Sequence, residues 1–165
     1  MNKKWQIYEN NAEKVQQISE KYNISKLLAT IIENRKIKEE QIETFLHPTR
    51  KHFHNPYLMP DMEIAVERIK KAIENQEKTI IYGDYDVDGI TSITVLKSFL
   101  QDRGLEVDSY IPNRLEEGYG LNKPAIDKIA KNNYTLMITV DTGISGIEEI
   151  EYANSKGIET IITDH

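Results

Sequence analysis

Hydrophobic residues recur at helical spacing between residues 11 and 46. The apolar positions are Val15, Ile18, Leu27, Leu28, Ile31, Ile32, Ile42, Phe45 and Leu46. This spacing predicts two or three short helices. Residues 47–61 show no periodicity and contain three prolines and three histidines, which is typical of a connector.

A further helix is expected after the connector. Asp61 is predicted to cap this helix, which runs to about Asn75. Its predicted buried face consists of Ile64, Val66, Ile69 and Ile73. The pattern therefore divides the chain into an N-terminal helical region with its connector, residues 1–60, and a second domain, residues 61–165.

The apolar pattern changes period beyond residue 78. Short runs rich in β-branched residues predict strands at 79–83, 106–111, 135–140 and 160–163. Stretches with helical spacing lie between them, at 90–102, 122–131 and 145–156. The alternation βαβαβαβ predicts an α/β fold, with a mostly parallel sheet and helices on both faces. Ligands of such sheets bind at the carboxyl ends of the strands.

Composition narrows the class of function. The 165 residues contain 21 Lys and Arg against 27 Asp and Glu, a net charge of −6, which excludes a uniformly basic surface for nucleic acid. Residues 1–78 carry a net +2 and residues 79–165 a net −8. Without cysteine, carboxylates, histidines and hydroxyls must perform any chemistry. No apolar run reaches the roughly 18 residues of a membrane span, so we expect a cytoplasmic protein that does not bind membranes.

Acidic residues follow the first predicted strand. The segment YGDYDVDGITS places Asp84, Asp86 and Asp88 two residues apart, so an extended backbone would point all three carboxylates to one side. Divalent cations can offset the repulsion within such a cluster. Gly89 permits a turn into the helix that is expected to begin near Ile90.

Two later strand ends repeat this arrangement. Asp141 follows the strand at 135–140 in the segment VDTGIS, and the strand at 160–163 ends in Asp164 and His165. An imidazole together with carboxylates suits manganese, iron or zinc. The three strand ends together indicate a two-metal hydrolase site.

The loop after the second predicted strand carries candidate nucleic-acid contacts. Arg114 could bind a phosphate, and Tyr119, between Gly118 and Gly120, could stack on a base. The alternative is that Arg114 is merely exposed and Tyr119 packed.

Two other functions remain open at this point. YDVDGIT resembles the nucleophile motif of haloacid-dehalogenase-like phosphatases, with Asp86 as nucleophile and Asp88 as acid. Gly83 and Asp84 would then interrupt the strand that should lead into Asp86, and Asp141 would have no role. The second alternative is a non-catalytic fragment that only folds or associates.

Three motifs together resemble the DHH phosphoesterase superfamily. They are GDYDVDGITS at 83–92, VDTGIS at 140–145 and TDH at 163–165. The stretches YIPNRLEEGYGLN at 110–122 and FLHPTRKHFHNPYLMPDMEIAVERI at 45–69 are similar to the single-strand-specific exonucleases of this superfamily. The resemblance covers at least residues 45–165 and assigns residues 61–165 to the N-terminal part of the DHH phosphoesterase domain.

The resemblance implies a site with two divalent cations, manganese or magnesium. Asp86, Asp88 and Asp141 match metal ligands, with Asp141 as the bridge between the ions, and His165 matches the first His of the Asp-His-His motif. Asp84 is implied to be a ligand or to orient one. More distant members place a metal-binding His four residues before the first ligand Asp, where this sequence has Tyr82.

The implied activity is phosphodiester hydrolysis by a 5′-to-3′ exonuclease on single-stranded DNA in recombination and repair. Asp86, Asp88, Asp141 and His165 are the implied catalytic residues. Single-stranded DNA is the implied partner, with a single-strand-binding protein or a helicase as candidate protein partners. The sequence stops at His165, before the second His and a later Asp of the family pattern, so we expect an N-terminal fragment that is inactive by itself.

Overall fold

The computed structural model describes residues 9–164. Its residues form two compact units that divide between Leu58 and Met59. Each unit has a hydrophobic core of its own.

The first unit contains three short helices, as the apolar spacing predicts. They are α1 (Ala12–Tyr22), α2 (Lys26–Asn34) and α3 (Glu39–Leu46). The side chains of Asn11 and Ser25 cap α1 and α2 by accepting backbone hydrogen bonds. The core of this unit consists of Val15, Ile18, Ala29, Ile32 and Ile42. The connector forms two 3-10 turns, η1 (Arg50–His52) and η2 (Pro56–Leu58).

The second unit is built on a four-stranded parallel sheet, which confirms the predicted fold class. The strands are β1 (Thr79–Gly83), β2 (Val107–Tyr110), β3 (Leu136–Val140) and β4 (Glu159–Thr163). Their order across the sheet is β2-β1-β3-β4. All five residues of β1 and of β3 are buried, because these strands lie in the middle of the sheet.

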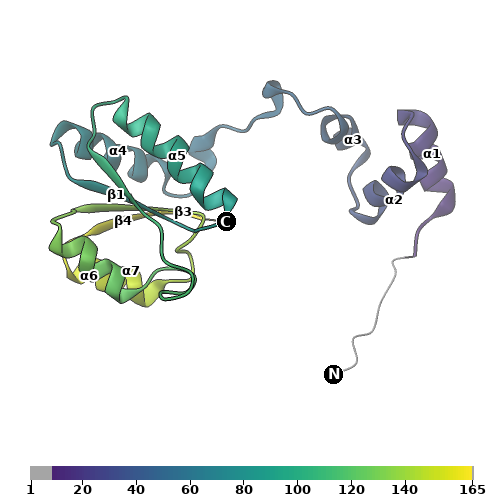
Figure 1. Ribbon diagram of the computed structural model, residues 1–165. Coiled ribbons are helices and arrows are strands. Elements are labelled where there is room, and N and C mark those ends of the chain that lie inside the picture. Colours follow the sequence, from purple (N-terminus) through teal and green to yellow (C-terminus); the bar gives the residue numbers. More distant parts are fainter. Residues whose placement is uncertain (1–8, 165) are drawn as a thin grey trace. The chain divides into compact units, whose positions relative to one another are not determined.

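Helices cover both faces of this sheet (Figure 1). α4 (Met62–Glu74) and α5 (Val87–Gln101) lie on one face, and α6 (Lys123–Lys131) and α7 (Ile147–Ser155) on the other. The apolar cluster beneath α4 and α5 includes Ala72, Ile81, Ile93, Leu100 and Ile138.

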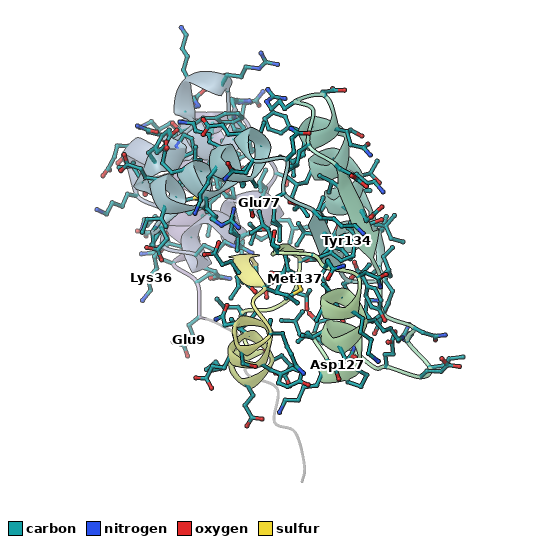
Figure 2. The ribbon with its side chains drawn as sticks, turned by 90° about the vertical axis from the view of Figure 1, so that its left-hand side faces the viewer. Glu9, Lys36, Glu77, Asp127, Tyr134 and Met137 are labelled. Atoms are coloured by element: carbon teal, nitrogen blue, oxygen red, sulfur yellow. The ribbon has the colours of Figure 1, made fainter. Side chains whose placement is uncertain are left out.

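The cluster on the other face of the sheet includes Ile80, Tyr82, Ile126, Ile129 and Met137. The side chain of Met137, on β3, lies inside the unit (Figure 2) and is fully buried. The alternation of side chains along each strand thus supplies one core from each face.

Two details of α4 differ from the prediction. Ile64 is 69% exposed, because at about 100° per residue it lies roughly a third of a turn from the face formed by Ile69, Ala72 and Ile73. Asp61 occupies the N-cap position, but its side chain makes no capping hydrogen bond, since its backbone is left-handed (φ 58°).

An ion cluster fastens the amino end of the sheet. Arg68 on α4 pairs with Glu77, with Nη2 2.7 Å from Oε2, and with Glu159 at the start of β4. Glu77 also accepts a hydrogen bond of 3.0 Å from the hydroxyl of Thr135. Partial burial would raise the pKa of Glu77, but the hydrogen bonds from Arg68 and Thr135 outweigh it, and the net pKa is lowered.

We therefore expect Glu77→Gln to destabilise the fold by about 1–3 kcal/mol near neutral pH, because Arg68, at a mostly buried position, loses one of its two charged partners and keeps only the more exposed Glu159. A carboxylate with a lowered pKa stabilises the fold above its unfolded pKa and loses that contribution as the pH falls through the folded pKa. The difference in free energy of unfolding between the native chain and the variant should consequently shrink below about pH 4.3. Urea denaturation followed by circular dichroism at several pH values measures this difference.

The matched control is Glu74→Gln, which removes the same charge from an exposed position on α4. Its stability should follow that of the native chain at every pH. Equal stabilities of Glu77→Gln and Glu74→Gln at pH 7 would contradict the role of the ion cluster.

Candidate metal centre

The candidate site lies where β1 and β3 end side by side. The register of this parallel pair places Gly83 opposite Val140. Asp84 and Asp141 are the next residues on the two strands. In the sheet, β2 lies on one side of β1 and β3 on the other. The carboxyl ends of β1 and β3 therefore flank a point where the strand order reverses. Such switch points are where open α/β sheets bind ligands.

Asp84 and Asp86 occupy the turn between β1 and α5. Asp84 is only 5% exposed, and its Oδ1 accepts a hydrogen bond of 2.7 Å from the backbone N–H of Tyr85. Asp86 is the N-cap of α5, and its Oδ1 accepts hydrogen bonds of 3.0 Å from the backbone N–H groups of Asp88 and Gly89. These two hydrogen bonds fix the Asp86 carboxylate at the N-terminus of the helix.

Gly89 allows the first turn of α5 to pack directly on Asp84. A Cβ atom at Gly89 would lie 2.4 Å from the carbonyl oxygen of Asp84 and 2.7 Å from its backbone nitrogen. A side chain at this position would therefore push the helix away from the strand end. Gly89 fixes the distance between the buried carboxylate and the N-terminus of the helix.

Asp141 adopts a left-handed backbone with φ 58°, which is uncommon for a residue other than glycine. Its backbone N–H still donates a hydrogen bond of 3.1 Å to the carbonyl of Thr163, so the turn stays joined to the end of β4. Asp164, after β4, accepts a hydrogen bond of 2.9 Å from the backbone N–H of Ile144. These two bonds hold the 141–144 turn against the adjacent strand end.

Asp84, Asp86 and Asp141 form a group that could hold a metal ion. One carboxylate oxygen of each lies within 4.8 Å of the others. Carboxylates at this spacing repel one another, and a bound cation offsets that repulsion. Three oxygen donors at this spacing suit hard cations such as magnesium and manganese.

A buried hydroxyl precedes Asp141 by two residues on β3. The Oγ1 atom of Thr139 is buried and has no hydrogen-bond partner among the described residues. Buried polar atoms are normally hydrogen-bonded. Thr142, directly after Asp141, and Thr160, near the start of β4, have buried hydroxyls without a partner in the described part of the chain as well, so this feature is not confined to the carboxylate group.

The premise that an extended backbone aligns Asp84, Asp86 and Asp88 is wrong. α5 begins at Val87 instead of near Ile90, because Asp86 caps the helix, and Asp88 therefore lies in the first helical turn. Asp88 is exposed and does not belong to the group of three carboxylates. His165 lies outside the described residues.

The two predicted nucleic-acid contacts lie in the loop between β2 and α6. The guanidinium carbon of Arg114 lies 5.1 Å from the centre of the Tyr85 ring, a cation–π distance. Tyr119 is 65% exposed. The pKa of its hydroxyl is raised, first by partial removal from water and then by the negative charges of Asp84, Asp164 and Asp141. Sequence reasoning missed Tyr85, although its place between two candidate ligands was a usable signal.

Comparison with known proteins shows the family of this chain. The model of the DHH family, N-terminal domain, matches residues 78–165. The chain belongs to the DHH family. The matched residues of this DHH protein include all four strands and each carboxylate of the group.

Relatives of this DHH protein include single-stranded-DNA-specific exonucleases named RecJ. The RecJ of Bacillus subtilis (strain 168) is 42% identical over 163 residues, which are 98% of this chain and 21% of that protein. The RecJ of Escherichia coli (strain K12) is 38% identical over 105 residues, which are 63% of this chain and 18% of that protein. The chain thus spans about one fifth of the length of these relatives.

Two solved structures are similar to this DHH protein. The crystal structure of exonuclease RecJ bound to manganese has a TM-score of 0.61 and 34% identity, over 66% of this chain and 28% of that one. RecJ from Thermus thermophilus in complex with Mn²⁺ has a TM-score of 0.66 over 94% of this chain and 21% of that one. At 21% identity, the second likeness shows the fold.

We expect Asp141→Asn to weaken manganese binding by about 10-fold or more, since a ligand charge is lost. Asn tolerates a left-handed backbone as Asp does, so the turn should keep its shape. The double variant Asp86→Asn with Asp141→Asn should abolish binding. Isothermal titration calorimetry with MnCl₂ measures both effects.

Asp102→Asn is the matched control, because it removes one negative charge at the C-cap of α5, the far end of that helix from Asp86. Lys97→Ala, within α5, should likewise leave manganese binding nearly unchanged. Native affinity in the double variant would show that the ions bind elsewhere.

Proposed function

We propose that this chain is the metal-binding part of an exonuclease that hydrolyses phosphodiester bonds of single-stranded DNA from the 5′ end. The observation that carries the proposal is the convergence of Asp84, Asp86 and Asp141 at the ends of β1 and β3. The identity to RecJ proteins over nearly the whole chain supports the choice of substrate.

We propose two divalent cations, manganese or magnesium, as cofactors. Asp84, Asp86 and Asp141 would hold them, with Asp88 and His165 as further ligands from the family pattern. Divalent cations at such a site acidify water and neutralise charge that develops on phosphate oxygens. The donor set fits, since each described member of the group offers a carboxylate oxygen.

The chain's own contribution is to keep the donors in place. Asp84 is held by burial and by the N–H of Tyr85, and Asp86 by the first turn of α5. We propose Asp86, Asp88, Asp141 and His165 as the catalytic set. A preorganised carboxylate group requires little rearrangement when cation and substrate bind.

Arg114 and Tyr119 are proposed to bind the DNA strand. The contact with Tyr85 keeps the Arg114 guanidinium next to the turn that carries Asp84 and Asp86, where it could pair with a phosphate. The side chain of Tyr119 is exposed over most of its surface and can stack on a base.

The phosphatase alternative has less support. Oδ1 of Asp86 accepts two backbone N–H groups as a helix cap, so a nucleophilic Asp86 would have to attack through Oδ2. It would also leave Asp141, which lies beside Asp86, without a role. The geometry therefore favours the metal-dependent reaction.

The cellular setting is also a proposal. Degradation of single strands from a 5′ end suits recombination and repair of DNA in the cytoplasm, alongside a single-strand-binding protein or a helicase. Among the described helices, none is long and apolar enough to cross a membrane.

A chimera tests the proposed function directly. The aligned segment of Bacillus subtilis RecJ is replaced by this chain, which matches it over 163 residues. The chimera should degrade 5′-labelled single-stranded DNA in manganese, and Asp141→Asn should lower the rate by about 100-fold or more. Asp102→Asn in the same chimera should keep full activity.

Two results would contradict the proposal. One is undiminished cleavage by the Asp141→Asn chimera. The other is hydrolysis of small phosphomonoesters by a folded chimera that leaves DNA intact, which would favour the dehalogenase-like reaction. The 165-residue chain alone should be inactive in the same assay.

The proposed role of Arg114 predicts a salt-dependent effect. Because the chain has a net charge of −6, its affinity for DNA must come from local contacts. In the intact enzyme, for which the chimera with Bacillus subtilis RecJ stands, Arg114→Ala should weaken binding of a 5′-phosphorylated oligothymidylate and reduce the salt slope by about one phosphate contact. Fluorescence anisotropy between about 50 and 200 mM salt measures both quantities.

Arg103→Ala is the control for this measurement, since Arg103 follows α5 at its far end and packs on Phe99. Its affinity and slope should match those of the native chain. If Arg114→Ala also matches the native chain, Arg114 does not contact phosphate.

A further inference from the structure

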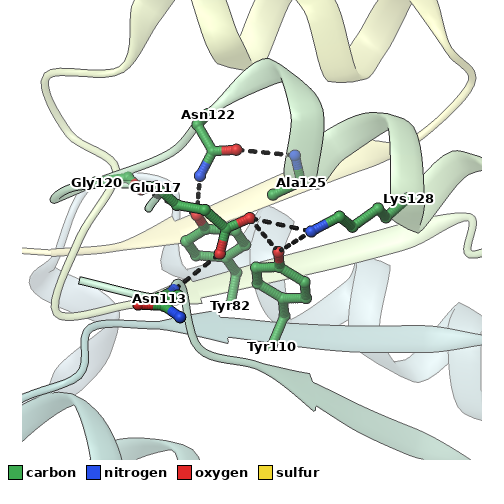
Figure 3. Close-up of polar contacts among 8 residues, drawn as sticks. All are labelled: Tyr82, Tyr110, Asn113, Glu117, Gly120, Asn122, Ala125 and Lys128. Carbon is green, nitrogen blue, oxygen red and sulfur yellow. Dashed lines mark hydrogen bonds and ion pairs between the residues drawn. The ribbon is translucent and has the colours of Figure 1, made fainter. Parts of the chain in front are cut away.

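A hydrogen-bonded network fastens the loop between β2 and α6 (Figure 3). At its centre lies the carboxylate of Glu117, whose side chain is only 14% exposed although it belongs to a loop. Oε1 of Glu117 accepts a hydrogen bond of 2.6 Å from the hydroxyl of Tyr110 and lies 3.2 Å from Nζ of Lys128. The network thus joins the loop to the end of β2 and to α6.

The same carboxylate closes the turn at residues 113–117. Its Oε2 accepts a hydrogen bond of 2.8 Å from the backbone N–H of Asn113, while the backbone N–H of Glu117 donates one of 2.7 Å to the Asn113 carbonyl. The side chain of Asn113 accepts a further bond of 3.0 Å from the N–H of Leu115. Arg114 lies inside this doubly closed turn, so its backbone position depends on Glu117.

A second anchor holds the other end of the loop. The hydroxyl of Tyr82 donates a hydrogen bond of 2.9 Å to the carbonyl of Gly120, and the Asn122 amide donates one of 3.2 Å to the same hydroxyl. The rings of Tyr82 and Tyr110 stack with centroids 5.3 Å apart. Tyr82 precedes Asp84 by two residues on β1, so this anchor ties the residue after Tyr119 to the strand that ends at the carboxylates.

The carboxylate of Glu117 has no direct contact with Asp84, Asp86 or Asp141 in the hydrogen bonds found among the described residues. Its partners are a phenol, a backbone amide and an ammonium group, all of which belong to the frame of the loop. A carboxylate that receives three donors in a nearly buried position has a structural task at that place. The functional residues on the same loop are Arg114 and Tyr119.

We propose that Glu117 is a positioning residue, which fastens the loop to β2 and α6 so that Arg114 and Tyr119 stand beside the carboxylate group and meet the end of a DNA strand. The inference deepens the proposed function and rests on it. Glu117 acts through the loop, and it touches neither the cations nor the DNA.

The test compares Glu117→Gln with Glu116→Gln. Both variants remove one negative charge from neighbouring positions, but Glu116 is exposed and its side chain forms no hydrogen bond among the described residues. On charge alone, each variant should bind DNA slightly more tightly than the native chain. If Glu117 positions the loop, Glu117→Gln should instead bind a 5′-phosphorylated oligothymidylate about 5-fold more weakly, because its amide donates toward groups that are themselves donors.

A mutant cycle separates positioning from a general loss of stability. In the background of Arg114→Ala with Tyr119→Ala, Glu117→Gln should cause little further loss of DNA affinity, because the contacts that Glu117 positions are already removed. Tyr110→Phe, which leaves the charge unchanged, should weaken binding in the same direction through loss of the 2.6 Å hydrogen bond. Arg114→Ala, Glu117→Gln and Tyr110→Phe should each bind manganese as tightly as the native chain does, as measured by calorimetry.

The outcomes distinguish this inference from the proposed function. Equal DNA affinities of Glu117→Gln and Glu116→Gln would overturn the positioning role, and so would an additive loss when Glu117→Gln is combined with Arg114→Ala and Tyr119→Ala. The proposed function would still stand if the native chain binds manganese and DNA. Failure of the native chain to bind manganese or the oligonucleotide would overturn the proposed function and this inference with it.

Discussion

The parallel pairing of β1 with β3 is the constraint on which the rest of the structure depends. Because Gly83 lies opposite Val140, the next residue of each strand carries its carboxylate to the same point of the sheet edge. Asp86 joins them as the cap of α5, so three carboxylates that repel one another gather at this point. A divalent cation offsets that repulsion, and cation binding is thus linked to the stability of this edge.

Backbone geometry at the same edge departs from regular structure in a way that serves the site. Asp141 is left-handed, and Gly89 lies so close to Asp84 that no side chain would fit. Unusual conformations persist where the surroundings determine them, and they concentrate at functional sites. Here the surroundings are the hydrogen bond from Asp141 to Thr163 and the packing of the first turn of α5.

Local pattern predicted the sheet well, because apolar β-branched runs such as residues 79–83 are buried on both faces and bounded by polar turns. The pattern failed at Ile64, which its apolar character assigns to the core although its helical phase places it away from the buried face. It also failed at the start of α5, where the acidic run suggests extended backbone although Asp86 caps the helix. The sequence around Asp86 is also compatible with a helix that Asp86 caps and that has Asp88 and Gly89 in its first turn. The anchors of the 111–121 loop could not be predicted, since the bond from Tyr82 to Gly120 joins residues 38 positions apart.

The central claim is that the carboxylates at the ends of β1 and β3 bind divalent cations. Anomalous diffraction from a crystal of this chain soaked in manganese, measured at the manganese absorption edge, tests that claim most directly. The account predicts an anomalous peak in direct contact with carboxylate oxygens of Asp84, Asp86 and Asp141. A well-ordered crystal with these three side chains visible and no peak between them would contradict it.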